Sequence, residues 1–323
     1  MALLHCWASS GWQTRAVIVI ACPGQGSQTP GFLDPWLQDA SAKDALARFS
    51  DEAGLDLVKH GTVSDADTIR DTAVAQPLIV AAGIVALDAL RKALPTDAAP
   101  FGGIAGHSVG EITAAYGAGI LSDSDAMSFV SERAVAMAEA AATTPTGMSA
   151  VLGGDQDAVV AHVRSFGLEP ANYNGGGQIV VAGAHDALAR LADEPLKGTR
   201  VIPLQVAGAF HTSYMQSARD WLAGASRTVE PQDPTLRIWT NHDGTEVTSG
   251  TAFFDLLIGQ VASPVRWDLC MDAFSAAGIT GLIELAPAGA LTGLARRGLK
   301  GVPTVAIKTP DDLPAALDLI AQQ

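Results

Sequence analysis

Hydrophobic and polar positions divide the chain into short apolar runs and longer amphipathic stretches. The β-branched run 17–21, which ends at a proline and a glycine, is typical of a buried parallel strand, and 101–104 predicts a second one. The stretch 72–94 predicts a long apolar helix, in which Pro77 is tolerated because it lies in the first turn. In the C-terminal part the pattern predicts strands 236–240, 281–285 and 303–307 and helices 213–226, 252–261, 268–277, 290–299 and 311–321.

From Gly147 onward the elements become shorter. They predict strand 148–152, helix 155–165, strands 169–172 and 178–182, helix 186–193 and strand 199–206. This order, β-α-β-β-α-β, is that of a ferredoxin-like unit. The sequence therefore predicts an α/β protein in which a large α/β-hydrolase-like domain with a parallel sheet carries a small inserted ferredoxin-like α+β subdomain. The expected divisions are an N-terminal extension at 1–15, the discontinuous large domain at 16–142 and 207–323, and the insert at 143–206.

One heptapeptide, A-G-H-S-V-G-E at 105–111, contains the pattern G-x-S-x-G directly after a predicted strand. In that context a sharp strand-to-helix turn exposes the serine, Ser108, and the glycines supply the room that the turn needs. A helix is expected at 112–117. Because the backbone N–H groups at its start are free, Val109 is a candidate donor to an oxyanion. A plain turn remains the alternative for this motif taken alone.

The turn after the first strand reads P-G-Q-G-S-Q at 23–28. It lacks the lysine of a P-loop and the third glycine of a dinucleotide fingerprint. Ligand sites in open parallel sheets lie at this end of the strands. The backbone N–H of Gln25 is therefore a candidate second oxyanion donor, with a plain polar turn as the alternative.

The stretch 121–142 predicts a helix that Ser122 and Asp125 open as a capping box. Arg133 falls on its apolar stripe, where a cation needs a partner. That partner is either an acidic side chain of another helix or a substrate carboxylate bound bidentately. Further along, the loop G-A-F-H places His211 at the expected seam between insert and large domain, where a capping role competes with that of a catalytic base for Ser108.

Composition narrows the function classes. Hydrophobic residues make up 48% of the 323 positions, mean hydropathy is +0.23, and no apolar run reaches about 18 residues, which predicts a soluble protein and no membrane partner. The net charge of -14 argues against nucleic acid. Cys6, Cys22 and Cys270 are too few and scattered for a disulfide framework, which favours the cytoplasm, and no spacing of metal ligands occurs.

Five motifs in order, P-G-Q-G-S-Q, G-H-S-V-G-E, a downstream arginine, G-A-F-H and Q-V-A-S-P-V-R-W at 260–267, resemble the malonyl-CoA:acyl-carrier-protein transacylases, especially the actinobacterial members of fatty-acid synthesis. The resemblance runs from about residue 17 to the C-terminus. It implies a serine acyltransferase that takes malonyl from malonyl-CoA and passes it to the phosphopantetheine thiol of acyl carrier protein. It implies no permanently bound cofactor.

The resemblance also assigns roles. It implies that Ser108 is the nucleophile, that His211 is its base and acid, and that Arg133 binds the malonyl carboxylate. The backbone N–H groups of Gln25 and Val109 become the oxyanion hole. Three further positions matched to the family are Gln260, whose backbone carbonyl orients the histidine, Asn174 near the histidine, and Phe210 in the malonyl-preferring form of the loop.

Two other classes stay open. A serine esterase or thioesterase could use the same elbow, although it would normally add an acid between serine and histidine and would not bury a cation near the acyl pocket. The second open class is a carrier-docking module without catalysis, or an acyltransferase that serves polyketide assembly. Because carrier proteins are acidic, docking on an acidic chain needs a basic patch. Its candidates are Arg296, Arg297 and Lys300, then Lys197 and Arg200.

Overall fold

The computed structural model describes residues 17–95 and 101–322, so the extension expected at 1–15 lies outside the described residues. A five-stranded sheet in the order β10-β9-β1-β2-β7 forms its centre, and all its paired strands run parallel. These strands are β1 (Ile18–Cys22), β2 (Gly103–Gly106), β7 (Ile238–Trp239), β9 (Gly281–Glu284) and β10 (Thr304–Ala306). The parallel sheet expected from the sequence is thereby confirmed.

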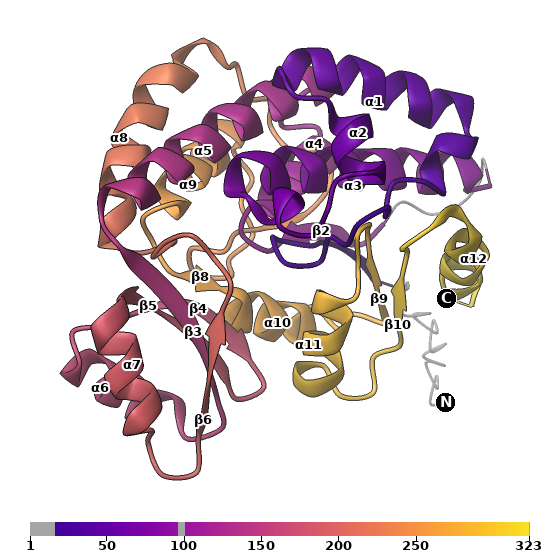
Figure 1. The fold of residues 1–323 in the computed structure, drawn as a ribbon. Coiled ribbons are helices and arrows are strands. Elements are labelled where there is room, and N and C mark those ends of the chain that lie inside the picture. Colours follow the sequence, from indigo (N-terminus) through magenta and orange to yellow (C-terminus); the bar gives the residue numbers. More distant parts are fainter. Residues whose placement is uncertain (1–16, 96–100, 323) are drawn as a thin grey trace, which may run out of the picture.

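Helices cover both faces of this sheet (Figure 1). One face carries α1 (Ala40–Ala53), α2 (Leu57–Thr62), α3 (Thr72–Ala93), α4 (Gly110–Gly117), α5 (Asp123–Thr143), α8 (Gln216–Ala225) and α9 (Gly250–Gln260). The opposite face carries α10 (Trp267–Ala276) and α11 (Ala290–Gly298), and α12 (Leu313–Ala321) packs at the edge against β10 and α3.

Strand β1 shows why a continuous apolar run was needed. Ile18 and Ile20 belong to the hydrophobic cluster under α3 and α5, whereas Val19 and Ala21 belong to the cluster around Trp267 on the other face. Because successive side chains of a strand point to opposite faces, a sheet covered on both sides leaves no polar position along the strand.

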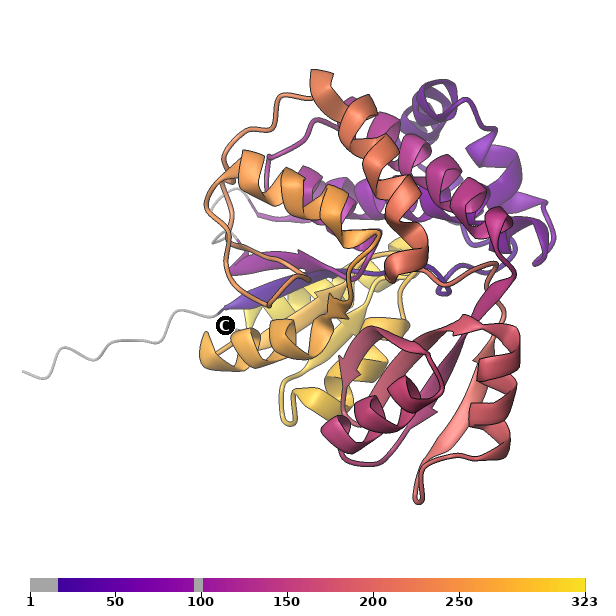
Figure 2. The same ribbon diagram turned by 90° about the vertical axis from the view of Figure 1, so that its left-hand side faces the viewer.

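The second sheet has the strand order β6-β3-β5-β4-β8. The elements β3 (Thr146–Leu152), α6 (Gln156–Ser165), β4 (Glu169–Gly175), β5 (Gln178–Ala184), α7 (His185–Asp193) and β6 (Arg200–Leu204) follow one another in the chain. Neighbouring strands among β3 to β6 pair antiparallel, and α6 and α7 pack on one face over a small core of their own. Figure 2 shows this unit beside the layers of the larger sheet.

Helix α3 crosses the centre of the protein. Its length and mean hydropathy of 1.9 would let it span a membrane, but 78% of its apolar window is buried inside the protein. Residues such as Leu78, Ile79 and Val80 are nearly inaccessible. A helix that is apolar all round is what the core of a protein this size requires.

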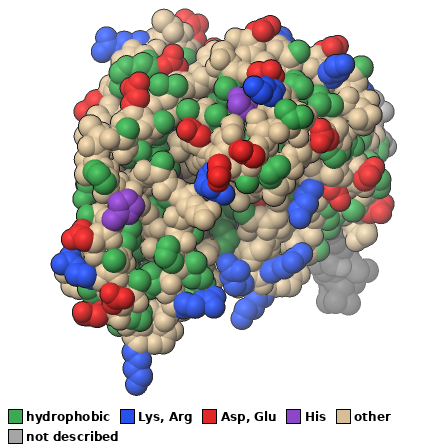
Figure 3. Space-filling view, in the orientation of Figure 1, with side chains coloured by type: hydrophobic (Ala, Val, Ile, Leu, Met, Phe, Trp, Pro, Cys, Tyr) green, Lys and Arg blue, Asp and Glu red, His purple; other side chains and the backbone are tan. Residues whose placement is uncertain are grey.

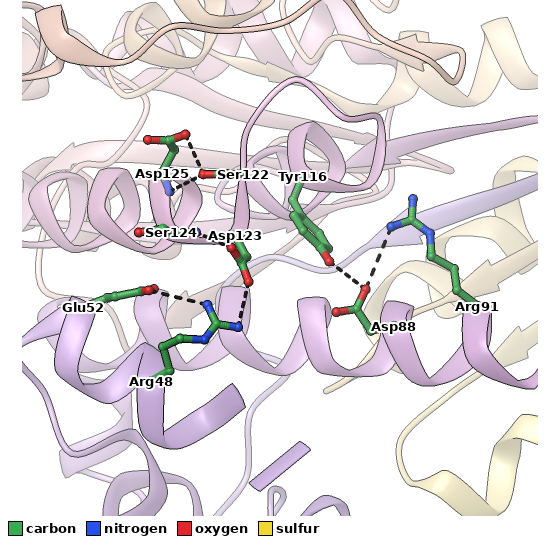
Figure 4. A network of polar contacts seen from close by, with 9 residues as sticks. All are labelled: Arg48, Glu52, Asp88, Arg91, Tyr116, Ser122, Asp123, Ser124 and Asp125. Carbon is green, nitrogen blue, oxygen red and sulfur yellow. Dashed lines mark hydrogen bonds and ion pairs between the residues drawn. The ribbon is translucent and has the colours of Figure 1, made fainter. Parts of the chain in front are cut away.

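Helix α5, which carries Arg133, is fixed at its N-terminus by the expected cap (Figure 4). The Ser122 hydroxyl accepts a hydrogen bond from the Asp125 N–H at 3.0 Å and donates to its carboxylate at 2.6 Å. Arg48 of α1 pairs with Asp123 at 2.8 Å. These contacts set the start of α5 and thereby the direction in which its apolar stripe faces.

Three features differ from the sequence-based expectations. Helices α1 and α2 were not predicted at all. The two-residue strand β8 (Val265–Arg266) was missed, although it joins the second sheet by pairing in parallel with β4. The helix expected at 213–226 begins with a short 3-10 turn at Ser213–Met215 before α8. Short pairings between distant segments leave no periodic signal in either segment, so the pattern could not reveal β8.

Candidate active site

The elbow between β2 and α4 has the backbone geometry that the glycines predict. Ser108 lies in the left-handed region with φ of 53°, which is strained for a residue with a side chain. A Cβ at Gly106 would lie 2.0 Å from the carbonyl carbon of Gly110, and one at Gly110 would lie 2.1 Å from the Cys22 oxygen. Only glycine fits at both positions, and the close packing forces the serine outward.

Ser108 and His211 meet although 103 positions separate them. The Ser108 Oγ lies 2.6 Å from His211 Nε2, and His211 Nδ1 lies 2.9 Å from the backbone oxygen of Gln260. If Nδ1 carries the proton and donates to this carbonyl, Nε2 is left as an acceptor for the serine proton. Burial and the charge of Arg133 lower the pKa of His211 to about 3, so the imidazole is neutral over the working pH range.

Two backbone N–H groups near the serine have no acceptor among the described residues. The Ser108 N–H itself donates to Asn241 Oδ1 at 2.8 Å and is therefore occupied. The next N–H, that of Val109, and the N–H of Gln25 donate to no described protein atom. Both residues line the same cavity as Ser108. Both N–H groups are therefore available to donate to a ligand oxygen in this cavity.

Arg133 is 1% exposed and extends from α5 toward the serine. Its guanidinium donates to Gln76 Oε1 at 2.5 Å, to Gln260 Oε1 at 2.8 Å and to Ser108 Oγ at 3.4 Å. No acidic side chain of the described chain lies within ion-pair distance of it. The alternative of a salt bridge to another helix is thus wrong. Burial lowers the pKa of Arg133 to about 10, which still leaves it charged near neutral pH.

A cavity of about 520 Å³ opens over these groups, between the parallel sheet and the second sheet. Ser108, His211, Arg133, Gln25 and Val109 line it. Its apolar wall includes Ile69, Met137, Met148, Val180, Leu204, Val206 and Phe210. The size suits a small-molecule ligand, and the single buried cation in the wall suits an anionic one.

Phe210 and Asn174 are the remaining site candidates in the cavity wall. Phe210 is buried in the cavity wall, as expected. Asn174 also lines the cavity, but its Oδ1 pairs with His107 Nε2 at 2.9 Å, and no hydrogen bond joins it to His211 in the described structure. Asn174 thus lines the same cavity as His211, and its hydrogen-bond partner in the elbow is His107, the residue before the serine.

Three polar residues of the site were not found from the sequence: Gln76, Asn241 and Glu111. Gln76 holds Arg133, and Asn241 accepts from the Ser108 N–H and donates to the Gly106 oxygen at 2.7 Å. Glu111 is buried behind the elbow, where desolvation raises its pKa above the usual carboxyl range, while the hydrogen bonds from Asn241 and Gln260 and the nearby charge of Arg133 lower it and favour the carboxylate. The motif A-G-H-S-V-G-E contains Glu111, and its place on a buried helix face was the available signal.

The basic docking candidates lie outside the cavity. Arg296 and Arg297 are in the last turn of α11 and Lys300 follows it, while Lys197 and Arg200 lie before and at the start of β6. Arg297 packs against Gly176, in the turn after the strand that carries Asn174. In the space-filling view of Figure 3, Lys and Arg side chains gather along the lower edge of the face that is turned to the viewer, below a hollow. Among the described residues no group of three His, Cys, Asp or Glu side chains could hold a metal ion.

Comparison with known proteins gives a consistent result. The sequence pattern of the family described as "Acyl transferase domain" matches residues 19–310. The chain is 46% identical over 303 residues to the malonyl CoA-acyl carrier protein transacylase of Mycobacterium tuberculosis, which spans 94% of this chain and 100% of the relative. It is 32% identical over 305 residues to the protein of the same name from Escherichia coli, which spans 92% and 97%.

Solved structures agree. The crystal structure described as MCAT from Mycobacterium tuberculosis superposes with a TM-score of 0.90 at 46% identity, covering 93% of this chain and 99% of that one. A malonyl-transacylase solved in complex with a type II PKS acyl-carrier protein superposes with a TM-score of 0.88 at 27% identity, covering 94% and 99%.

Proposed function

The chain belongs to the acyl transferase family, among the malonyl CoA-acyl carrier protein transacylases, and from this premise we propose how its residues carry the reaction. The reaction moves a malonyl group from the thioester of malonyl-CoA to the phosphopantetheine thiol of acyl carrier protein. Ser108 is the nucleophile, His211 the base and acid, and Arg133 the binding group for the malonyl carboxylate.

In the acylation half, His211 Nε2 takes the proton of the Ser108 hydroxyl while the oxygen attacks the thioester carbonyl. The carbonyl oxygen becomes negative, and the N–H groups of Gln25 and Val109 stabilise it. As the carbon–sulfur bond breaks, the imidazolium returns its proton to the coenzyme A sulfur. The Gln260 carbonyl keeps the ring in the required orientation through its 2.9 Å contact with Nδ1.

In the second half the phosphopantetheine thiol occupies the place that coenzyme A has left. His211 removes the thiol proton, the sulfur attacks the malonyl-serine ester, and the proton passes to the departing Ser108 oxygen. Both halves use the same pair of atoms, which lie 2.6 Å apart. The exchange of one thioester for another is nearly balanced, so the direction depends on the concentrations of the two thiols.

Arg133 supplies the preference for malonyl. The malonyl carboxylate is one methylene removed from the thioester carbonyl, and the guanidinium already lies 3.4 Å from the attacking oxygen. A planar fork of two N–H donors matches a carboxylate in two hydrogen bonds. The observation that carries the proposed function is this juxtaposition of a serine–histidine pair with a buried guanidinium that lacks an acidic partner in the described chain.

Intact-mass spectrometry tests the proposal directly. After mixing with malonyl-CoA, the protein is expected to gain one malonyl group, and addition of holo-carrier protein is expected to remove that group and transfer it to the carrier. The Ser108→Ala variant should gain none, because the acyl-enzyme needs that oxygen. An undiminished adduct on this variant would exclude Ser108 from the mechanism.

The thioesterase alternative predicts a different product in the same assay, because it releases free malonate whether or not carrier protein is present. An esterase triad also needs an acidic side chain on the histidine. In the described structure His211 Nδ1 faces the backbone oxygen of Gln260 instead. This arrangement favours the transacylase.

We further propose that the recipient is the carrier protein of fatty-acid elongation and that it docks on the basic residues of α11. The polyketide alternative is tested by competition between the two kinds of carrier for the malonyl-enzyme. Arg296, Arg297 and Lys300 give an acidic partner a local positive surface on a chain whose net charge is -14. The second candidates, Lys197 and Arg200, belong to the proposed insert itself, before and at the start of β6.

The finer description of the fold is also a proposal. Strand order and antiparallel pairing of β6-β3-β5-β4 support a ferredoxin-like insert at 143–206, and the elbow after β2 supports a hydrolase-like large domain formed by 16–142 and 207–323. A cytoplasmic location and the lack of a permanent cofactor stay predictions from the sequence. Limited proteolysis, in which the insert is released as one resistant fragment, would test the division.

A further inference from the structure

Glu111 is a buried acid that the reaction scheme above does not use. It is the residue after Gly110 in α4, it is 1% exposed, and no Lys or Arg of the described chain pairs with it directly. Instead, both of its carboxylate oxygens face donors. The backbone N–H of Asn241 donates to Oε1 at 2.6 Å, and the side-chain amide of Gln260 donates to Oε2.

The first connection leads from Glu111 to Arg133 through the Gln260 amide. Gln260 Nε2 donates to Glu111 and also to the Ser108 carbonyl at 3.1 Å, so its two protons are used. Its Oε1 accepts from Arg133 Nη2 at 2.8 Å. Turning this amide over would place its NH₂ group against the guanidinium and its oxygen against a carboxylate and a carbonyl. Glu111 therefore fixes which end of the amide faces Arg133.

The second connection leads to the elbow through Asn241. The N–H of Asn241 is held by Glu111, while its side chain accepts from the Ser108 N–H at 2.8 Å and donates to the Gly106 oxygen at 2.7 Å. These bonds support the strained turn of the nucleophile from outside the cavity. The backbone oxygen of Gln260 also accepts from His211, so the two residues that Glu111 contacts are hydrogen-bonded to Ser108, His211 and Arg133.

We propose that Glu111 is a positioning residue for malonyl selection: through Gln260 it aims the guanidinium of Arg133, and through Asn241 it holds Ser108, without contacting the substrate. This inference rests on the proposed function and deepens it. Within this network of described residues, only the Glu111 carboxylate accepts on two oxygens, one from the Asn241 N–H and one from the Gln260 amide. No neutral side chain can replace both contacts.

The substitution Glu111→Gln separates this role from simple packing. Glutamine has nearly the same shape, but it presents one oxygen and one NH₂ group to two donors. The NH₂ group of the new glutamine then faces another donor, either the Asn241 N–H or Gln260 Nε2. Where it faces Gln260 Nε2, the Gln260 amide can relieve the conflict only by turning over, which places its own NH₂ group against Arg133. Glu111→Asp keeps the charge but is one methylene short, so it is expected to retain one of the two contacts.

The experiment compares kcat/KM for malonyl-CoA and acetyl-CoA in the parent, E111Q, E111D and a control, Glu284→Gln. Glu284 is also a fully buried carboxylate that accepts two N–H bonds, those of Leu291 and Thr292, but it caps α11 and does not line the cavity. We expect the malonyl-to-acetyl ratio to fall about tenfold to a hundredfold in E111Q, the scale of a lost charge-assisted hydrogen bond, to fall less in E111D, and to stay unchanged in E284Q.

Labelling of Ser108 by a small neutral sulfonyl fluoride is measured on the same proteins and should fall less than malonyl transfer in E111Q. A ratio within about twofold of the parent in E111Q, or in E111D if E111Q does not fold, overturns the inference and leaves the proposed function standing. A lower melting temperature with an unchanged ratio assigns Glu111 a structural role only. Absence of any malonyl adduct on the parent protein would overturn the proposed function itself, and this inference with it.

Discussion

Replacing Arg133 with alanine distinguishes a malonyl transferase from an enzyme for neutral acyl groups built on the same elbow. The guanidinium is nearly inaccessible and is held by Gln76 and Gln260, which supply carbonyl oxygens and no charge. A malonyl carboxylate bound there would be the only acidic group in direct contact with the guanidinium among the described residues, since Glu111 reaches it only through Gln260. Removing one partner of such a buried pair costs about 3 to 5 kcal/mol.

The free energy converts directly into rate. Since about 1.4 kcal/mol is a factor of ten, Arg133→Ala should lower kcat/KM for malonyl-CoA by roughly 100-fold to 4,000-fold. Acetyl-CoA has no carboxylate, so its kcat/KM should change far less and the malonyl-to-acetyl ratio should collapse. Lysine at this position should recover little, because a point charge cannot offer two parallel donors.

The same substitution has opposing effects on stability. The amide oxygens of Gln76 and Gln260 lose their donor, at about 1 to 3 kcal/mol each, whereas removal of a desolvated cation is favourable. The melting temperature should therefore change little. Arg48→Ala is the matched control, because Arg48 pairs with Asp123 at the far end of the same helix and is half exposed (Figure 4).

Acylation would be followed by stopped-flow release of coenzyme A, and unfolding by thermal denaturation. An unchanged malonyl-to-acetyl ratio in Arg133→Ala, together with a clear fall in melting temperature, would refute the carboxylate-binding role. In that case Arg133 would serve only to join α5 to α3 and α9.

Four further predictions concern the other groups. His211→Ala should slow acylation by about 100-fold to 10,000-fold in stopped-flow measurements, and a burst as fast as that of the parent would exclude a general base. Because the pKa of His211 is lowered from 6.5 to about 3, acylation should show no loss between pH 7 and 5 from its protonation, and a limb centred near 6.5 would contradict this. Because the pKa of His211 is lower in the folded than in the unfolded state, the stability that neutral His211 contributes is complete above pH 6.5 and is lost as pH falls toward 3. Urea unfolding at several pH values measures this loss. Charge reversal at Arg296 and Arg297 should raise KM for carrier protein and leave KM for malonyl-CoA nearly unchanged. Arg227→Glu, in the short 3-10 turn after α8, is the control, and equal effects on both KM values would contradict docking on α11.

What the sequence determined on its own is local. The spacing of Gly106, Ser108 and Gly110 after a strand dictates the elbow, because the clash of any Cβ there involves residues only a few positions apart or the neighbouring strand end. The cap of α5 and the β-α-β-β-α-β order were readable for the same reason, since caps, turns and periodicity act within a few residues.

The tertiary structure alone decided which side chains surround the serine. Arg133 meets Gln76 across 57 positions, Ser108 meets Asn241 across 133, and Gln260 meets Glu111 across 149. No local pattern marks such partners, because a buried amide or carboxylate has the same sequence signature as an exposed one until packing brings a donor to it. The sequence thus identified Ser108 as the candidate nucleophile, while the packing of α3, α4, α5 and α9 on one sheet determined which side chains surround it.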